Sequence, residues 1–332
     1  MIERWTAGGD WLEVLDRASV SQARELVRRL GAEAGLAEVT LESLATAASE
    51  LAQNQLDHAR AGRVAVRPVT RGGVAGVEVI AADAGPGVAD PAGALAGRGP
   101  ASGLGAGLAG ARRLAQELDL DVRAGEGTCA RARAFARPVP RSEVATFGRP
   151  FPGERLSGDD AAFVRTDDAL LVAVVDGLGH GPEARAASAV VADALVSAPD
   201  AALPDLVARA HAAAEGTRGA VIALVRLHLA TRAIEHVGLG DVRVLLGGPG
   251  GTQALPAQPG LLSGRAHERA RVRSNAAALS PHGVLLLLSD GLKSAAGPPS
   301  APVAEPIALA QDLVARFGRD TDDALALVVR TG

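Results

Sequence analysis

The chain has 332 residues, of which 48% are hydrophobic and 22% are charged, as in globular proteins with a buried core. Its single cysteine, Cys129, excludes an intramolecular disulfide and a cysteine-based zinc cluster. The 34 Lys and Arg residues against 38 Asp and Glu give a net charge of −4, which lacks the basic excess of a nucleic-acid-binding protein.

No segment reaches the ~18 consecutive apolar residues of a transmembrane helix. The segment Met1–Trp5 lacks the basic region and following apolar run of a secretory signal. We therefore expect a cytoplasmic protein that makes no contact with membrane or nucleic acid.

Two helical patterns open the chain. Apolar residues recur at helical spacing up to Gly31, where the first helix is expected to end, and a second helix is predicted from Thr40, a candidate N-cap, to Ala59. Alternating residues at 63–69 and 74–82 on either side of two glycines then predict a β-hairpin. A helix over 104–118 and a short strand pair within 120–136 are expected to follow.

Four prolines between residues 138 and 152 suggest a domain boundary near 138, which gives domains 1–137 and 138–332. In the second domain, continuous apolar runs at 169–175 and 284–288 predict strands buried on both faces. The remaining predicted elements are a hairpin of strands 221–229 and 234–246 and helices over 182–196 and 307–317.

Three motifs in the first domain point to a nucleotide site. Glu50 and Asn54 lie one helical turn apart, where a carboxylate and an amide oxygen can hold hydrated Mg²⁺ and activate a hydroxyl or water. Alone, this pair is more typical of a solvated polar face. Asp83 ends a strand and precedes Gly85 and Gly87, so its carboxylate can accept a hydrogen bond from an exocyclic amine, although an ordinary turn has the same composition.

The third motif is Gly103, Gly105 and Gly107 at the start of a helix, where backbone N–H groups can cradle phosphates. The order of the three motifs resembles the N, G1 and G2 boxes of the GHKL ATPases, and residues 40–136 more closely resemble RsbT-type serine protein kinases. The resemblance implies a Bergerat α/β sandwich that binds ATP and Mg²⁺. It implies Asn54 as the Mg²⁺ ligand, Glu50 as general base, Asp83 at the adenine amine, Gly85 and Gly87 around the adenine pocket, the three helix-start glycines at the phosphates, and Thr128 near the adenine.

Four acidic clusters mark the second domain, at residues 157–160, 175–177, 289–291 and 321–323. Two of them directly follow long apolar strands, so their carboxylates are expected at one end of a sheet. Converging carboxylates repel one another unless a hard cation such as Mg²⁺ or Mn²⁺ is present. A single Asp-Gly pair is usually a turn, but four clusters favour a two-metal site that activates water for attack on phosphorus.

The order of these clusters resembles the SpoIIE/RsbX branch of metal-dependent serine/threonine phosphatases over residues 150–330, most specifically at Asp176–Ala184. The resemblance implies an αββα sandwich with two Mn²⁺ or Mg²⁺. The resemblance further implies that Asp176 bridges the two metals and that Gly177 offers its carbonyl. The remaining carboxylates that it implies are those of Asp159, Asp290 and Asp322. The roles of Asp160 and Asp323 are left open.

Two positions depart from the family pattern. Gly240-Asp241 stands where many members have Gly-Asn, so the part played by this loop is open. Relatives outside the branch have a histidine two residues after the bridging aspartate, where this chain has Leu178. His180 is displaced by two residues, and whether it is a catalytic acid or only a loop residue is left open. If it is a loop residue, protonation of the leaving group falls to a metal-bound water.

The sequence therefore predicts an α+β protein with a Bergerat domain and an αββα phosphatase domain. The expected function is that of a bifunctional signalling regulator in a sigma-factor or stress pathway. Such a regulator would remove phosphate from serine or threonine of a partner. The resemblance to RsbT-type kinases implies that it also phosphorylates a STAS-domain antagonist. The alternative is that the N-terminal domain only binds ATP and a partner, so that the phosphatase alone is an enzyme. A homodimer is left open.

Overall fold

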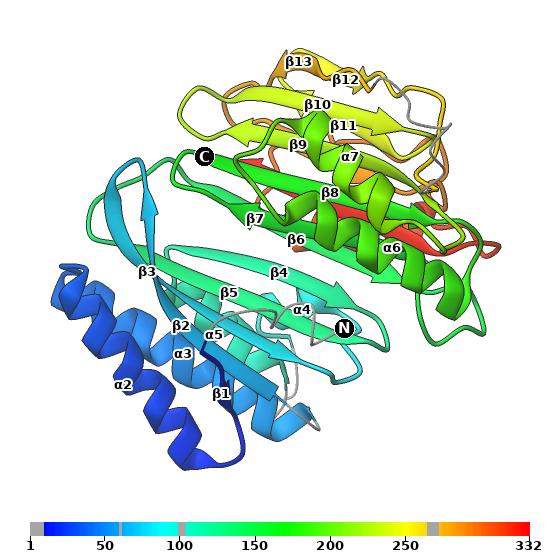
Figure 1. Ribbon diagram of the computed structural model, residues 1–332. Coiled ribbons are helices and arrows are strands. Elements are labelled where there is room, and N and C mark those ends of the chain that lie inside the picture. Colours follow the sequence, from blue (N-terminus) through cyan, green and yellow to red (C-terminus); the bar gives the residue numbers. More distant parts are fainter. Residues whose placement is uncertain (1–9, 60–61, 99–103, 264–271) are drawn as a thin grey trace. The chain divides into compact units, whose positions relative to one another are not determined.

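The computed structural model describes residues 10–59, 62–98, 104–263 and 272–332 (Figure 1). The chain divides into two compact units, Met1–Ala145 and Thr146–Gly332. Strand β6 (Ser142–Arg149) runs through the point of division. The boundary near residue 138, suggested by the prolines, remains a prediction.

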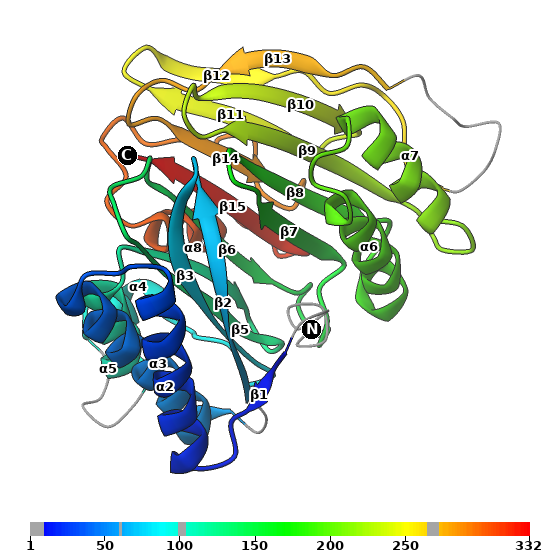
Figure 2. The same cartoon turned by 60° about the vertical axis from the view of Figure 1, so that its left-hand side comes forward.

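The first unit is an antiparallel sheet with its helices gathered on one side (Figure 2). Its strands lie in the order β1-β2-β3-β5-β4. The strands are β1 (Leu12–Glu13), β2 (Gly62–Arg71), β3 (Val74–Asp83), β4 (Glu117–Arg123) and β5 (Gly127–Phe135). The helices are α2 (Arg17–Glu33), α3 (Glu38–His58), α4 (Pro91–Leu95) and α5 (Leu104–Leu114). This arrangement confirms the predicted α/β sandwich.

The bounds of the first two helices differ from the prediction. Helix α3 begins at Glu38 with Ala37 as its N-cap and no side-chain capping bond, so Thr40 as N-cap was wrong. Gly31 lies inside α2 and does not end it. A Cβ at Gly31 would lie 3.2 Å from the side chain of Leu41 in α3, so the missing side chain favours close packing of the two helices.

The strand predictions for this unit hold. Strands β2 and β3 pair in full register across Gly72 and Gly73, which both have positive φ, as a tight hairpin turn requires. Helix α5 ends at Leu114 instead of residue 118, because residues 117–123 form β4 and pair with β5. Strand pairing with β5 satisfies the backbone N–H and C=O groups of residues 117–123, so the helix does not continue through them.

A ladder of alternating charges crosses this sheet. Arg67 of β2, Glu78 of β3, Arg133 of β5 and Glu117 of β4 are successive cross-strand neighbours. The Arg133 guanidinium lies 2.7 Å from Glu78 and 3.4 Å from Glu117, and it also pairs with Asp119. The charges of Arg133 and Arg67 hold the pKa of Glu78 at about 2 in spite of its burial. One guanidinium thus satisfies three buried carboxylates.

Replacing Arg133 by methionine should destabilise the protein by about 3–5 kcal/mol, the usual cost of removing one partner from a buried ion pair. The methionine fills a similar volume but leaves Glu78, Glu117 and Asp119 without their shared cation. Urea denaturation followed by circular dichroism measures the change. The same substitution at the exposed Arg137 is the control and should change stability by less than about 0.5 kcal/mol. Equal stability of the two variants would contradict the role of the ladder.

The second unit is a sandwich of two antiparallel sheets with helices on both outer faces, as predicted. One sheet has the order β13-β10-β9-β8-β7, and the other contains the run β15-β14-β11-β12. Helices α6 (Gly181–Val196) and α7 (Leu203–Ala213) cover the five-stranded sheet (Figure 1), and α8 (Pro306–Phe317) packs on β15. The strands are β7 (Asp159–Arg165), β8 (Ala169–Gly177), β9 (Ala220–His228), β10 (Ala233–Leu239), β11 (Arg243–Gly248), β12 (Gly251–Leu255), β13 (Asn275–Ala278), β14 (Val284–Leu288) and β15 (Ala324–Thr331).

The apolar runs behave as expected: β8 and β14 are almost wholly buried strands. The single strand predicted over 234–246 was wrong. It is broken at Gly240, whose φ of +83° turns the chain, so that β10 and β11 belong to different sheets. The hydrophobic pattern continues through this turn because both strands are buried, and periodicity alone therefore could not reveal the break.

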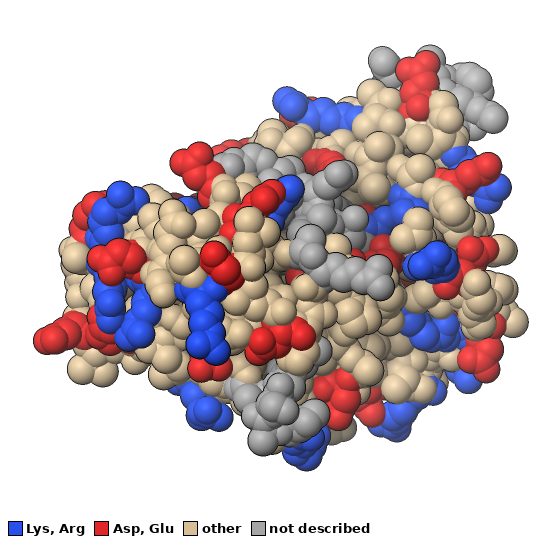
Figure 3. Space-filling view, turned by 90° about the horizontal axis from the view of Figure 1, so that it is seen from below, with Lys and Arg blue, Asp and Glu red and all other residues tan. Residues whose placement is uncertain are grey.

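One face of the molecule agrees with the near balance of charges (Figure 3). Acidic and basic side chains intermingle over the face drawn in Figure 3. Within the described ranges, no helix is both long and apolar enough to cross a membrane.

Candidate functional sites

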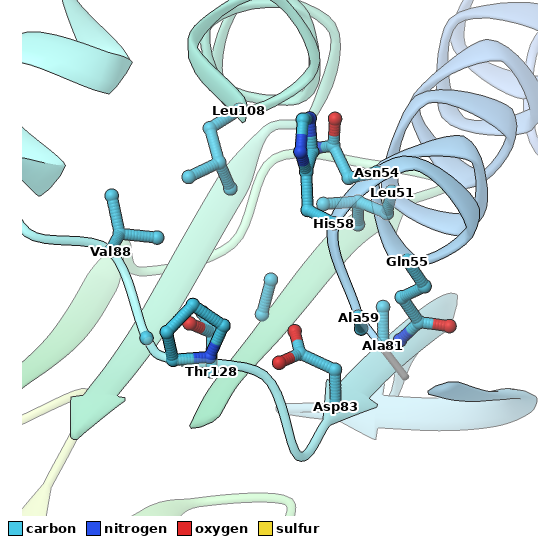
Figure 4. Close-up of a pocket in the computed structure, with 13 residues that line it drawn as sticks. Leu51, Asn54, Gln55, His58, Ala59, Ala81, Asp83, Val88, Leu108 and Thr128 are labelled. Atoms are coloured by element: carbon cyan, nitrogen blue, oxygen red, sulfur yellow. The ribbon is translucent and has the colours of Figure 1, made fainter. Parts of the chain in front are cut away.

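A pocket in the first unit lies between helix α3 and the ends of β3 and β5 (Figure 4). Apolar side chains form most of its wall, and Asn54, Asp83 and Thr128 bring polar groups to it. The lining residues are Leu51, Asn54, Gln55, His58, Ala59, Ala81, Asp83, Pro86, Gly87, Val88, Leu108, Thr128 and Ala130. An apolar pocket with a few polar groups is typical of a small-molecule site.

Asp83 is a half-buried acidic residue that lines this pocket. It ends β3 opposite Thr128 of β5, and its carboxylate points into the pocket (Figure 4). The Oδ1 atom accepts a hydrogen bond of 2.8 Å from the Gly85 N–H. Burial raises the pKa of Asp83, and hydrogen bonds from the backbone N–H groups of Gly85 and Thr128 offset part of this effect. A carboxylate held in this way can accept a hydrogen bond from an amine that enters the pocket.

The glycines around this pocket are required by close approaches. Gly87 has a φ of +72°, and a Cβ there would lie 2.5 Å from the Arg123 carbonyl oxygen. A Cβ at Gly107 would lie 2.2 Å from Asn54 Oδ1, so this glycine lets α5 approach α3 at the predicted Mg²⁺ ligand. Gly105 lies in the first turn of α5, and Gly103 is outside the described residues.

Glu50 and Asn54 lie on α3, but only Asn54 lines the pocket. Glu50 is half-buried beside Gly110 of α5, where a Cβ would lie 3.4 Å from Glu50 Cγ. The two side chains thus face the same helix, one turn apart, as their spacing predicted. The pocket brings together Asn54, Asp83, Gly87 and Thr128 from the predicted set, and their roles toward a nucleotide remain predictions.

Asp83→Asn should weaken ATP binding by about 1.5–3 kcal/mol, the contribution of a hydrogen bond to a charged group. The substitution replaces the carboxylate that faces the pocket by an uncharged amide of the same shape. Isothermal titration calorimetry with ATP and with GTP measures the change. GTP lacks the exocyclic amine in question, so the wild-type chain should prefer ATP and the variant should lose that preference. Equal affinity of the wild type for both nucleotides would contradict the assignment.

A second site lies at one end of the sandwich in the second unit, where strand ends bring carboxylates together. Asp159 begins β7 directly opposite Asp176 near the end of β8. Asp290 follows β14, Asp241 follows the turn at Gly240, and Asp322 precedes β15. A cavity is lined by Asp176, Asp241, Asp290 and Asp322. The strand topology therefore gathers acidic side chains from five separate segments.

Carboxylate oxygens of Asp176, Asp241 and Asp290 lie within 4.8 Å of one another. Burial raises the pKa of Asp176 to about 10, and the neighbouring charges of Asp159 and Asp290 contribute to this rise. Burial likewise raises the pKa of Asp159, Asp290 and Asp322. Asp159 Oδ2 is buried without a hydrogen-bond partner among the described residues. Oxygen donors that repel one another in this way fit a hard divalent cation such as Mg²⁺ or Mn²⁺.

Gly177 has a packing reason to be glycine. A Cβ there would lie 2.2 Å from the Ala184 carbonyl oxygen, so a side chain would push β8 away from the start of α6. Its N–H donates to the Gly158 carbonyl at 3.3 Å. The part of its own carbonyl in binding metal remains a prediction.

Asp241 is the acidic residue that the predicted metal set omitted. The Gly240-Asp241 pair was visible in the sequence, but its departure from the family pattern left it open. The positive φ of Gly240 turns the chain so that the next residue reaches the carboxylate group. A signal was present in the sequence: a glycine and an aspartate lie side by side between two apolar strands, in the reverse order of the pairs Asp176-Gly177 and Asp290-Gly291.

Asp160 and Asp323 contact the segments that carry the carboxylate site. Asp160 alternates with Asp159 along β7 and is fully buried, 3.8 Å from Arg185 of α6. Asp323 Oδ1 accepts a hydrogen bond of 2.7 Å from the Phe151 N–H. Asp160 therefore ties β7 to a helix, and Asp323 fixes the segment that leads to Asp159.

The fold and these two sites define a GHKL-type ATPase domain followed by a metal-dependent phosphatase domain. Residues 166–331, half of the chain, match the family model of stage II sporulation protein E (SpoIIE), and residues 14–134 match that of the histidine kinase-like ATPase domain. The chain therefore belongs to the SpoIIE family and has a histidine kinase-like ATPase domain in front of its phosphatase domain.

Two proteins of Bacillus subtilis (strain 168) are similar to the two halves. The serine/threonine-protein kinase RsbT is 36% identical over 118 residues, which are 35% of this chain and 89% of RsbT. The phosphoserine phosphatase RsbX is 26% identical over 141 residues, which are 42% of this chain and 69% of RsbX. The fusion expected from the motifs is thus confirmed.

Solved structures agree on the fold. A chain from a structure of the bacterial stressosome is 27% identical, with a TM-score of 0.54, over 57% of this chain and 100% of that one. RsbX in complex with magnesium is 21% identical, with a TM-score of 0.51, over 59% of this chain and 98% of that one. The second likeness supports the phosphatase fold alone.

Proposed function

We propose that this chain is a bifunctional regulator in a partner-switching pathway that controls a sigma factor or a stress response. Its second unit removes phosphate from serine or threonine of a protein partner, and its first unit phosphorylates a STAS-domain antagonist with ATP. The observation that carries the proposal is the group of three carboxylates at Asp176, Asp241 and Asp290. The names of the two Bacillus relatives, a kinase and a phosphoserine phosphatase, support it.

In the phosphatase unit, Asp159, Asp176, Asp241, Asp290 and Asp322 would hold two Mg²⁺ or Mn²⁺ ions. Such ions, when bound, neutralise phosphoryl charge and increase the acidity of water. Asp176 lies opposite Asp159 in the sheet and beside Asp241 and Asp290, so it is the residue best able to bridge two ions. The Gly177 carbonyl would complete the donor set.

In the kinase unit, Asp83 would accept a hydrogen bond from the adenine amine in the pocket that also contains Thr128 and Gly87. Asn54 would hold Mg²⁺, and Gly103, Gly105 and Gly107 would present N–H groups to the phosphates. Glu50, one turn from Asn54, would accept the proton of the substrate serine. In the alternative function, this unit binds ATP and a partner protein but transfers no phosphate.

The test of the phosphatase uses the full chain with a phosphoserine peptide. Release of inorganic phosphate should require Mn²⁺ or Mg²⁺ and should stop when EDTA is added. The test of the kinase incubates the chain with labelled ATP and a STAS-domain protein from the same cell. No phosphate release at any concentration of either metal would contradict the phosphatase, and unlabelled STAS protein would favour the alternative for the first unit.

A further inference from the structure

His180 lies in the mouth of the carboxylate site. It is the N-cap residue of α6 and lines the same cavity as Asp176, Asp241, Asp290 and Asp322. Its side chain is half exposed, so a substrate can reach the ring. The sequence left its role open, because its orientation depends on a segment some thirty positions earlier in the chain.

Two contacts fix the ring of His180. Its Nδ1 lies 3.1 Å from Glu154 Oε1, and because an ionised carboxylate only accepts hydrogen bonds, Nδ1 carries the proton and donates it. The ring also stacks on Phe151, with centroids 4.4 Å apart and planes 14° from parallel. These contacts leave the other ring nitrogen, Nε2, as the one that can meet a substrate in the cavity.

The segment that contains Phe151 and Glu154 is itself anchored by Asp323, the neighbour of Asp322. The Phe151 N–H donates to Asp323 Oδ1, and the Glu154 N–H donates to the Phe151 carbonyl at 2.9 Å. Gly181 follows His180 with a φ of +76°, and a Cβ there would lie 3.1 Å from the Glu154 carboxyl. The pair of Glu154 and His180 is thus positioned by the same strand end that carries Asp322.

We propose that His180 is the proton donor for the serine or threonine oxygen that leaves phosphorus, an inference that rests on the proposed phosphatase function. A water oxygen bonds to phosphorus as the bond from phosphorus to the side-chain oxygen breaks. The Nε2 proton of the imidazolium passes to that oxygen and yields the alcohol. The attacking water releases one proton to solvent, and the neutral imidazole regains one from solvent.

The chemistry of the leaving group explains the need for a donor. A serine alkoxide is a strong base and leaves poorly unless a proton arrives as the bond breaks, whereas a nitrophenolate leaves without one. The side chain at position 178 is apolar and cannot supply this proton. A histidine oriented by a carboxylate is a common arrangement for proton transfer in enzymes.

The test compares His180→Gln with wild type on two substrates, a phosphoserine peptide and p-nitrophenyl phosphate, with Mn²⁺ present. The variant should lose about 10²–10⁴-fold in kcat on the peptide, the usual effect of removing a general acid. It should keep kcat within a few-fold on p-nitrophenyl phosphate. Glu154→Gln, which alters only the residue that positions the ring, should show a smaller loss in the same direction.

His228→Gln is the matched control, because His228 ends β9 at the end far from Ala220, the neighbour of Gly177. It should change neither rate. An equal loss on both substrates in His180→Gln, or no loss on the peptide, would overturn the role of His180. Calorimetric titration with Mn²⁺ should give wild-type affinity for His180→Gln, and weaker binding would overturn the role as well. Failure of the wild type on both substrates would instead refute the proposed phosphatase function.

Discussion

Asp176→Asn should reduce hydrolysis of a phosphoserine peptide by about 10²-fold or more, since it removes a proposed carboxylate ligand of the metal ions that act on the phosphoryl group. Asp176 lies opposite Asp159 and within 4.8 Å of Asp241 and Asp290 at its carboxylate oxygens. The substitution removes the carboxylate charge that lies next to Asp159, Asp241 and Asp290. Initial rates at saturating Mn²⁺ measure the effect. Wild-type turnover in the variant would contradict the metal assignment.

The matched control is Asp168→Asn in the exposed turn that joins β7 to β8, at the far end of the same two strands. It makes the same chemical change without touching the carboxylate group, so it should keep the wild-type rate. A loss of activity in both variants would point to damage of the hairpin and not to a lost metal ligand.

Unfolding experiments on Asp176→Asn give a second readout. The pKa of Asp176 rises from 3.8 to about 10 in the metal-free fold, so the folded protein retains a proton that the unfolded chain releases. This group therefore costs stability increasingly as the pH rises from 3.8 to about 10. In EDTA at neutral pH the variant should melt at a higher temperature than wild type, and Mn²⁺ should stabilise wild type more than the variant. The opposite order in EDTA would contradict the burial of this charge.

The sequence predicted the main elements because their patterns are local. Strands β8 and β14 were visible as unbroken apolar runs, and the β2–β3 hairpin as alternation around two glycines. Helix α7 was not predicted, and the exposed strands β12 and β13 carry little apolar signal. The break at Gly240 was missed because the apolar pattern on both sides belongs to two buried strands in different sheets.

The acidic site was predictable where an aspartate stands at the end of a long apolar run, as Asp176 and Asp290 do. Its completion depends on contacts between distant segments. Asp241 joins the group only through the turn at Gly240, and His180 is oriented by Phe151 and Glu154. Residues that come into contact only through tertiary structure have no regular spacing in the sequence. Sequence patterns therefore indicate which residue types form the site but not which residues contact one another.

Glu50→Gln should abolish phosphoryl transfer by the first unit while leaving ATP binding nearly unchanged. Glu50 does not line the nucleotide pocket, and it faces α5 one turn away from Asn54. Its proposed part is chemical, and loss of a general base commonly lowers the rate by about 10²–10⁴-fold. Because glutamine has nearly the same shape, the free energy of unfolding should change by only about 0.5 kcal/mol.

The measurement pairs ATP affinity with transfer of labelled phosphate to a STAS-domain protein, in chains that also carry Asp176→Asn so that the product accumulates. Glu38→Gln, an exposed position in the first turn of the same helix, is the matched control and should keep both activities. Transfer that is present in the chain with Glu50 and lost in the Glu50→Gln variant supports a kinase. Equal transfer in both chains would remove Glu50 from the mechanism. If neither chain transfers phosphate but both bind ATP, the result favours a unit that uses ATP only to hold its partner. ATP binding then survives the loss of Glu50, whose sole proposed task is proton transfer.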